Sequence, residues 1–171
     1  MKVQLVVRAS VLSAFLVAGV AANAVAAASN ATAASSAKPT AIMQSAYTHL
    51  VSGKPEKAIA EYSVAISLPE ISVNDKARAL LNRALAHQKA AAHQNAVADY
   101  SQAIELDALS ASTRAVALYN RGLANSKLNN RSAAIDDYTN ALYLDPYLSE
   151  AFYARANVLR EAGQYDYALI D

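Results

Sequence analysis

Three pairs of arginine and aspartate residues recur along the chain at one separation. They are Arg83 with Asp99, Arg121 with Asp137, and Arg155 with Asp171, each pair at positions i and i+16. Acid–base or nucleophilic catalysis would need a second titratable group or a nucleophile beside each pair, and none recurs at a constant position. We therefore interpret the pairs as structural ion pairs, each joining two antiparallel helices.

The three histidines are the other candidates for chemistry. His87 follows His49 at position i+38, and His93 lies close to His87 in the chain. A zinc site needs three or four converging ligands with supporting contacts, and the sequence has no cysteine and no HExxH motif. We interpret the histidines as packed, hydrogen-bonded residues between helices, and we expect no metal and no other cofactor.

Other signatures of enzymes and of nucleic-acid binding are absent from the sequence. It has no glycine-rich phosphate loop and no GxSxG nucleophile motif. The formal net charge of +1 argues against binding nucleic acid through a general basic surface. We expect the protein not to be an enzyme and not to bind nucleic acid.

A stripe of small and large side chains identifies the elements that position these residues. Ala134, Tyr138 and Ala141 are spaced four and three residues apart, so they share one face of a helix. The same set recurs at i−38 and again at i−76, as Ala96, Tyr100, Ala103 and as Ala58, Tyr62, Ala65. Self-similarity at such a period is typical of stacked repeats, in which each unit buries its apolar face against its neighbours.

This pattern resembles the tetratricopeptide repeat. The resemblance is carried by Gly122, Ala134, Tyr138, Ala141, Asp145 and Pro146, by their counterparts Ala84, Ala96, Tyr100, Ala103, Asp107 and Ala46, Ala58, Tyr62, Ala65, and by a partial copy with Phe152, Ala156, Gly163, Tyr165 and Ala168. It covers about residues 39–171 and implies an all-α superhelix (solenoid) of stacked antiparallel helix hairpins, with about three and a half repeats. The family period is about 34 residues, whereas the first two steps here are 38.

We expect four helix pairs. Their predicted bounds are 41–52 and 55–67, 75–90 and 93–106, 113–128 and 131–143, and 147–161 and 164–171. The four extra residues of each longer step lie between repeats, where they either lengthen the next helix by about one turn or form an insertion loop. Asn74 or Asp75, and Ser112 or Thr113, are the expected caps of these helices.

The amino-terminal part of the chain is predicted to lie outside the repeats. Residues 1–26 resemble a secretory signal peptide, with Lys2 and Arg8 before an uncharged run from Ala9 to Ala22 and small residues for cleavage. An uncleaved membrane anchor is the alternative, but spanning a bilayer takes about 20 apolar residues. Residues 27–40, rich in Ala, Ser and Thr, predict a flexible linker, and residues 41–171 the repeat domain. We therefore expect an exported protein, periplasmic or secreted, with no stable membrane span after cleavage.

The resemblance also implies a binding surface, because in this family the first helices of the pairs line a concave groove for peptides. The residues that it places there are Arg78, Asn82, Lys89, Tyr119, Asn120, Lys127, Tyr153, Asn157 and Arg160. Asn amides can hydrogen-bond a peptide backbone, Lys and Arg attract carboxylates, and Tyr offers stiff contact area. A solvated face with no ligand is the alternative interpretation. A dedicated clamp for a terminal carboxylate fits less well, because Glu150 and Glu161 lie in the last copy.

The resulting hypothesis is a non-catalytic scaffold that binds a protein or peptide partner in its groove. The alternative is a structural or assembly subunit that self-associates or docks through its open carboxyl-terminal repeat. This second idea arises because the sequence stops at Asp171, within the fourth hairpin, and leaves Phe152, Val158, Leu159 and Leu169 without a covering helix.

Overall fold

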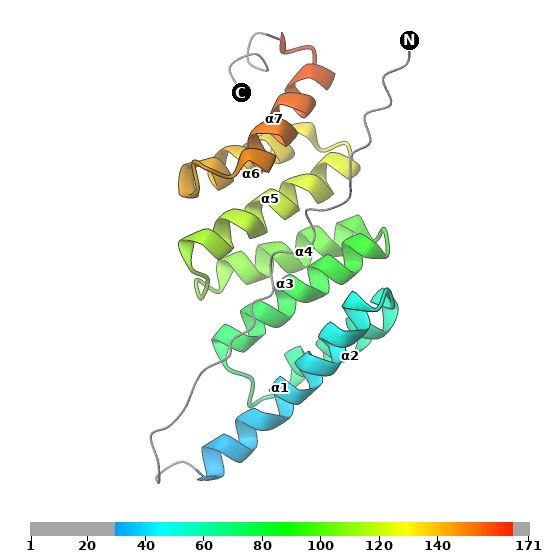
Figure 1. Ribbon diagram of the computed structural model, residues 1–171, viewed down its shortest axis with the longest axis vertical. Helices are drawn as coiled ribbons and strands as arrows, with labels where there is room; N and C mark the ends of the chain where they lie inside the picture. Colours follow the sequence, from blue (N-terminus) through cyan, green and yellow to red (C-terminus); the bar gives the residue numbers. More distant parts are fainter. Residues whose placement is uncertain (1–29, 166–171) are drawn as a thin grey trace.

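The computed structural model describes residues 30–165, with side chains from Lys38 onward, and within them it contains seven α-helices and no strand. The helices are α1 (Asn30–Val51), α2 (Pro55–Ser67), α3 (Val73–Lys89), α4 (His93–Glu105), α5 (Ala111–Lys127), α6 (Arg131–Leu144) and α7 (Ser149–Glu161). Each helix packs against the next one in the chain. The described chain is therefore a stack of helix pairs (Figure 1).

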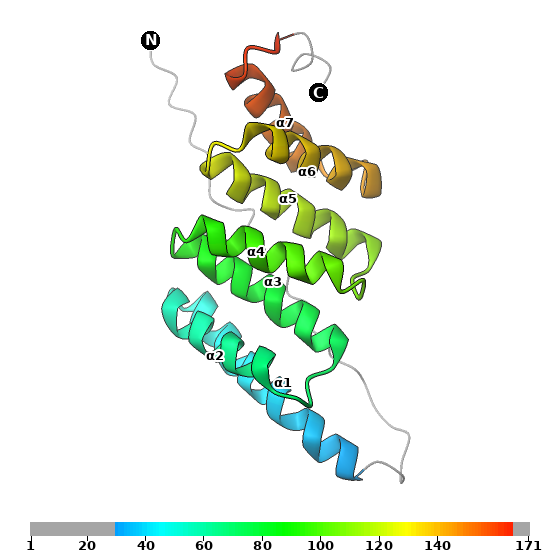
Figure 2. The same cartoon turned by 180° about the vertical axis from the view of Figure 1, so that it is seen from behind.

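The stack has two layers. The front helices, which we define as α1, α3, α5 and α7, lie on one face, and the back helices α2, α4 and α6 lie on the other (Figures 1 and 2). Contacts run within each pair and also from each back helix to the front helix of the next pair. The predicted all-α solenoid of antiparallel hairpins is confirmed.

The core consists of a large aromatic ring in each back helix surrounded by alanines. Tyr62, Tyr100 and Tyr138 are almost completely buried, and the alanines of the same stripes have no exposed surface. Small side chains allow neighbouring helices to approach closely, and the tyrosine rings fill the remaining space between them. The stripe that predicted the repeat is therefore the seam that holds it together.

The long period comes from longer front helices. Both α3 and α5 have 17 residues, whereas α7 has 13. The carboxyl ends of α3 and α5 fall at Lys89 and Lys127, a step of 38, whereas α7 ends at Glu161, a step of 34. The four extra residues thus add about one turn to the start of a helix, which confirms the lengthened-helix interpretation over the insertion loop.

The expected caps of these two helices are wrong by two residues or more. The caps are Ser72 and Ser110, whose hydroxyls accept hydrogen bonds from the backbone N–H groups of Asp75 and Thr113. Both serines have extended backbone conformations, which is the geometry that an N-cap requires. The helices therefore begin at Val73 and Ala111, earlier than predicted.

The linker prediction is also wrong for part of its length, because α1 begins at Asn30 and continues through Pro39. Alanine has the highest helix propensity of all residues, so an Ala-rich stretch can continue a helix without an apolar stripe. The ring of Pro39, the tenth residue of the helix, is buried. The predicted signal peptide, residues 27–29 of the linker and residues 166–171 of the last predicted helix lie outside the described residues. Within residues 30–165, no helix is both long enough and apolar enough to cross a membrane.

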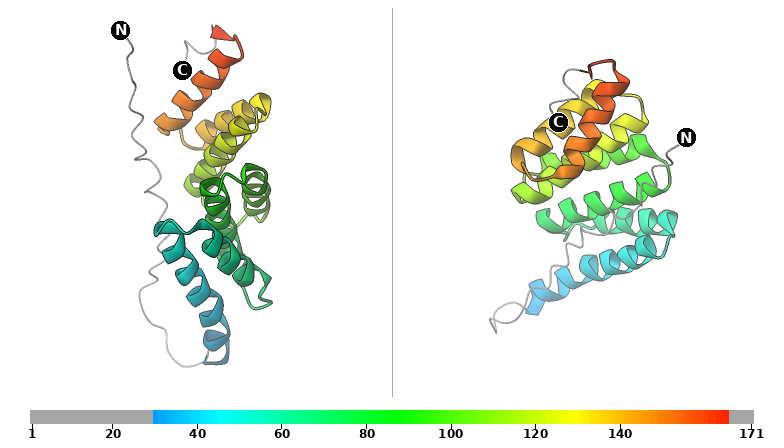
Figure 3. Two further views of the ribbon diagram at one scale, coloured as in Figure 1. Left: turned by 90° about the vertical axis from the view of Figure 1, so that its right-hand side faces the viewer. Right: turned by 45° about the horizontal axis from the view of Figure 1, so that its top comes forward.

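The two long edges of the stack are built differently. We define the turn edge as the short turns 52–54, 90–92 and 128–130, which join each front helix to its back helix, with residues 162–164 after α7. Each of these turns contains a residue in the left-handed region, namely Gly53, Ala91, Asn129 and Gly163, so every front helix ends in the same way. The loop edge is formed by the longer connections 68–72, 106–110 and 145–148. In Figure 1 the turn edge lies on the right and the loop edge on the left, and the left view of Figure 3 faces the turn edge.

Candidate functional site: the front face between α3 and α5

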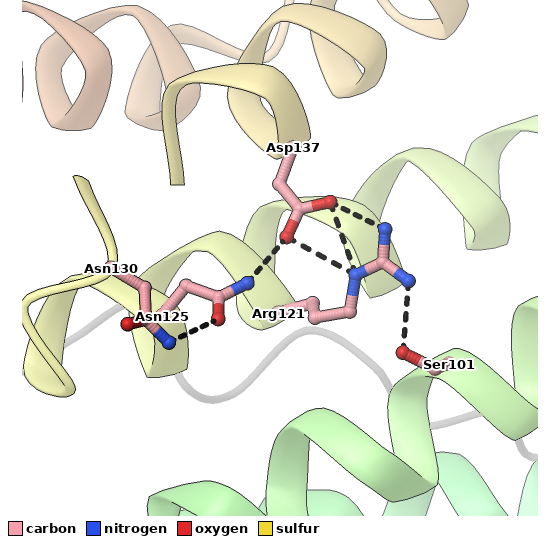
Figure 4. A network of polar contacts seen from close by, with 5 residues as sticks. All are labelled: Ser101, Arg121, Asn125, Asn130 and Asp137. Atoms are coloured by element: carbon pink, nitrogen blue, oxygen red, sulfur yellow. Dashed lines mark hydrogen bonds and ion pairs between the residues drawn. The ribbon is translucent and has the colours of Figure 1, made fainter. Parts of the chain in front are cut away.

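A buried ion pair fixes α5 against its neighbours. Arg121 on α5 contacts Asp137 on α6, with 3.0 Å between Nε and Oδ1 and 2.6 Å between Nη2 and Oδ1. The second carboxylate oxygen accepts a hydrogen bond of 3.0 Å from the Asn125 amide. The remaining guanidinium nitrogen of Arg121 donates to the Ser101 hydroxyl on α4 at 3.0 Å. Figure 4 shows how this one arginine links three helices.

The preceding repeat contains the same arrangement. Arg83 on α3 contacts Asp99 on α4 at 2.7 Å and 2.6 Å, and it donates to Ser63 on α2 at 3.0 Å. Here the neighbouring side chain is His87, whose Nε2 lies 3.7 Å from the carboxylate. Both carboxylates are almost fully buried, so the arginines offset a desolvation cost that a lone charge could not bear.

Two of the three predicted ion pairs are thereby confirmed, and the third involves Asp171, outside the described residues. Arg155 nevertheless donates to the hydroxyl of Thr139 on α6 at 3.1 Å, which repeats the link to the preceding back helix. Sequence reasoning missed the hydroxyl partners Ser63, Ser101 and Thr139. Their signal was available, because each one directly follows a core tyrosine of the repeating stripe.

These ion pairs determine which side of each front helix faces outward. Because Arg83 and Arg121 point backward into the seam, the residues on the opposite side of α3 and α5 face the surface between these two helices. A hollow of about 30 Å³ lies there, room for about two water molecules or the tip of one side chain. Its lining comes from α3 (Arg78, Leu81, Asn82, Leu85), from α5 (Thr113, Val116, Ala117, Asn120) and from Tyr100 of α4.

The two walls of the hollow have the same helical register. Each wall uses positions i, i+3, i+4 and i+7, counted from Arg78 on α3 and from Thr113 on α5, and such positions share one face of a helix. Asn82 and Asn120 are equivalent positions of successive repeats and stand on opposite walls. The hollow thus combines aliphatic walls with two half-buried amides, which can accept and donate hydrogen bonds at its rim.

Two hydrogen bonds connect the walls of the hollow to its base. The Tyr100 hydroxyl donates to the Gln88 side-chain oxygen at 2.8 Å, and the Gln88 amide donates to the backbone carbonyl of Asn120 at 3.0 Å. Burial raises the pKa of Tyr100 above its ordinary value, with a smaller contribution from Asp99, so the phenol stays protonated and remains a donor. Sequence reasoning did not identify Gln88, and the repeat pattern gives no signal for it, because Ser126 takes its place in the next copy.

Comparisons with known proteins identify the family. Residues 77–108 and residues 115–148 each match the tetratricopeptide repeat family. This is a tetratricopeptide repeat protein.

Several solved structures have a similar fold. The crystal structure of MamA is 21% identical with a TM-score of 0.69, covering 77% of this chain and 72% of that one. The first repeat domain of Spaghetti (RPAP3), bound to an HSP90 peptide, is 23% identical with a TM-score of 0.66, covering 75% and 95%. The second repeat domain of human RPAP3, in complex with an HSP70 peptide, is 24% identical with a TM-score of 0.61, covering 74% and 97%. The comparison with curated proteins gave no match.

The structure brings three of the nine groove residues of this tetratricopeptide repeat protein to the hollow, namely Arg78, Asn82 and Asn120. Arg78 is held by an ion pair with Asp75 on its own helix, 3.1 Å between nitrogen and oxygen. Lys89 and Lys127 are the last residues of α3 and α5. They therefore lie at the turn edge, about 10 Å along the helix axis from the asparagines, at about 1.5 Å per residue.

The other four lie on α5 and α7, away from the hollow. Tyr119 packs on the ring of Tyr138, with 6.0 Å between ring centroids, so it belongs partly to the core. Tyr153 is exposed on α7. Asn157 and Arg160 are joined by a hydrogen bond of 3.2 Å. Residues of the hollow that sequence reasoning missed are the apolar ones, Leu81, Leu85, Val116 and Ala117, together with Thr113.

Two of the histidines lie between paired helices, as predicted. The prediction that the histidines are hydrogen-bonded is not confirmed, because the buried Nδ1 atoms of His87 and His93 have no hydrogen-bond partner among the described residues. His49 lies 3.5 Å from the Glu61 carboxylate across α1 and α2, in the position that His87 occupies beside Asp99 in the next pair. His93 begins α4. Among the described residues, no three His, Asp or Glu side chains are grouped in a way that could hold a metal ion.

Proposed function

We propose that this protein is an interaction scaffold that binds a peptide segment of a protein partner on its front face, across α3 and α5. The hollow between these helices carries the proposal, because its lining combines aliphatic side chains with two half-buried amides. Support also comes from the family, since two similar tetratricopeptide repeat domains are bound to peptides, one of HSP90 and one of HSP70.

The chemistry of the hollow favours an aliphatic side chain over an acidic one. The peptides bound to those two neighbours end in EEVD, and such a segment would need converging cations. Here Arg78 is already paired with Asp75, and Lys89 and Lys127 lie at the turn edge. We therefore propose that one aliphatic side chain of the peptide enters the hollow, while Asn82 and Asn120 hydrogen-bond its backbone.

A peptide selected from a random library on immobilised chain 27–171 provides the test. Its affinity would be measured by fluorescence anisotropy for the parent and for the double variant Asn82→Arg/Asn120→Arg. The chain offers a matched control in Gln102→Arg/Asn140→Arg, two exposed positions on the back helices that are likewise equivalent in successive repeats. We expect the first variant to lose about tenfold or more in affinity and the control to bind like the parent. Equal affinities for both variants would reject the front face as the binding site.

A second candidate, assembly through the carboxyl-terminal repeat, is favoured by the distribution of exposed aromatic residues. Tyr143 is 86% exposed, Tyr147 94%, Tyr153 58% and Tyr165 62%, and all four lie on or beside α6 and α7. Exposed aromatic side chains of this size are common at interfaces. Under this candidate the mass measured by light scattering rises with concentration, and Tyr147→Ser/Tyr153→Ser returns it to the monomer value. A monomer at every concentration would exclude it.

We further propose that the protein acts outside the cytoplasm, on the basis of the signal-like residues 1–26. Amino-terminal sequencing of the chain recovered from the producing cells would test this. A mature chain beginning near Ala27 supports export, whereas an intact Met1 in a cytoplasmic fraction contradicts it.

A further inference from the structure

The turn edge carries a row of cations that neither the ion-pair network nor the hollow uses. It consists of Lys54, Lys57, Lys89, Lys127, Arg131 and Arg160, all of them exposed. Every one lies in a turn, in the last two residues of a front helix or in the first three residues of a back helix. The turns beside which these cations lie follow one another along the same edge of the stack (Figure 1 and the left view of Figure 3).

These six cations have no acidic partner among the described residues. The acids that lie on the same edge are Glu56 and Glu161, so positive charge predominates there. The loop edge is the opposite case. Its arginines are paired locally, Arg78 with Asp75 and Arg114 with Asp107, and its further acids include Glu70, Glu105 and Glu150.

We propose that the turn edge is a second binding surface, separate from the hollow, and that it binds an extended acidic segment of a protein. The cations follow a line one turn wide instead of covering a plane. They are interrupted by neutral residues within each turn, such as Ala90–Ala92 and Leu128–Asn130. A long flexible chain fits such a line, because it can follow the edge from repeat to repeat.

The geometry sets the spacing of acidic residues in this segment. Neighbouring helix axes lie about 8–10 Å apart, so successive turns, two helices apart, are separated by up to about 20 Å. An extended polypeptide rises about 3.3 Å per residue and covers one step with about six residues. A segment of about 20 residues with acidic side chains in each stretch of six would therefore reach all four turns.

The test uses a fluorescein-labelled 20-residue peptide containing glutamates, and a second peptide in which glutamine replaces every glutamate. Anisotropy at low salt would compare the parent chain with Lys89→Glu/Lys127→Glu. The matched control is Lys38→Glu/Lys76→Glu, which changes net charge equally but lies away from the turn edge, in the middle of α1 and in the first turn of α3. Circular dichroism would verify that both variants are folded.

We expect the glutamate peptide to bind the parent, with an affinity that falls as salt is added. The turn-edge variant should bind about tenfold more weakly, because each substitution removes an attraction and adds a repulsion. The glutamine peptide should not bind. The control variant should bind the glutamate peptide nearly like the parent, and Asn82→Arg/Asn120→Arg should bind it at least as tightly, because it adds positive charge and leaves the turn-edge cations in place. This last arm separates the turn edge from the front face, so the two proposals can fail independently.

Three results would overturn the proposal. The first is equal weakening by the turn-edge variant and its control, which would reduce the effect to net charge. The second is absence of binding by the parent at low salt. The third is tighter binding of phosphatidylglycerol vesicles or duplex DNA than of the glutamate peptide, with the same dependence on Lys89 and Lys127, which would assign the edge to a different class of partner.

Discussion

The repeat formed by α3 and α4 and the repeat formed by α5 and α6 contain the same ion pair but surround it differently. At the position beside the core tyrosine, the earlier repeat has Ala84 and the later one has Gly122. A Cβ atom on Gly122 would lie 2.6 Å from Cε1 of Tyr138, so the tyrosine ring occupies the space that an alanine would need. The two rings are therefore seated differently, although the sequence around them is similar.

The second partner of the buried carboxylate, beside its arginine, also differs. In the later repeat Asn125 donates a hydrogen bond of 3.0 Å to Asp137, whereas in the earlier one His87 lies 3.7 Å from Asp99. An amide donates at every pH, but an imidazole changes its charge near neutrality. The arginine–aspartate pair is therefore the constant part of these two repeats, and the groups around it determine tolerance to substitution and to pH.

The largest effect is expected when the constant part is removed. Arg121→Ala leaves the Asp137 carboxylate, which is 3% exposed, without its charged partner. Breaking a buried pair in this way costs about 3–5 kcal/mol, and we expect about 3 because the guanidinium itself is partly exposed. Urea denaturation followed by circular dichroism would measure the loss, and Arg83→Ala should give a loss of similar size.

Arg160→Ala serves as the control for this experiment. Arg160 is exposed and has only a surface hydrogen bond to Asn157, so its substitution should change stability by less than about 0.5 kcal/mol. If Arg121→Ala unfolds at the same urea concentration as the parent, the ion pair does not hold the repeat together, and the interpretation of both networks is wrong.

A smaller loss is expected from Gly122→Ala. Alanine favours a helix over glycine by about 1 kcal/mol, so on an open helix the substitution would stabilise. Here the new methyl group would overlap the Tyr138 ring, and overpacking of this kind costs about 1–3 kcal/mol. We expect net destabilisation of about 1 kcal/mol, measured by thermal unfolding of the parent and the variant.

Tyr138→Leu in the Gly122→Ala background sharpens this prediction. If the ring causes the clash, the smaller side chain should make Ala at position 122 less harmful than it is beside tyrosine. A stabilised Gly122→Ala variant would instead show that Tyr138 can shift at little cost.

Much of the fold could be predicted from the sequence, because the same residue types recur at equivalent positions and each copy supports the assignment of the others. From α2 to α6 the helix ends differ from prediction by two residues or fewer, since recurring turns and stripes mark them. The start of α1 could not be predicted in this way. Residues 30–40 carry no apolar stripe, and their helix depends on alanine propensity and on the buried ring of Pro39.

The candidate site was predicted only in part, for a geometric reason. Asn82 and Lys89 are seven residues apart and do share a helix face, but two turns also separate them by about 10 Å along the axis. The lysine therefore reaches the turn edge while the asparagine borders the hollow. Leu81 on α3 and Val116 on α5 also line the hollow. Sequence reasoning considered polar side chains and missed these two, because they give the hollow its shape and carry no charge.

The smallest effect is expected from exchanging the second partners of the two carboxylates, His87 and Asn125. Burial lowers the pKa of His87 below its ordinary value of 6.5, Asp99 raises it and Arg83 lowers it further. The folded protein thus resists protonation of His87, while the unfolded chain takes up a proton near pH 6.5. This contribution to stability is fully present above that ordinary value and is lost as the pH falls through the lowered, folded-state value.

Replacing His87 with asparagine, the residue of the later repeat, should therefore remove part of the pH dependence. Between pH 7.5 and pH 5.5 (about one unit either side of the ordinary histidine value), the free energy of unfolding of His87→Asn should fall less than that of the parent. The reciprocal variant Asn125→His places an imidazole beside Asp137 and should fall more. Urea denaturation at both pH values measures these differences. If both variants keep the slope of the parent, burial of His87 is not what makes the earlier repeat sensitive to acid, and the two repeats differ only in packing.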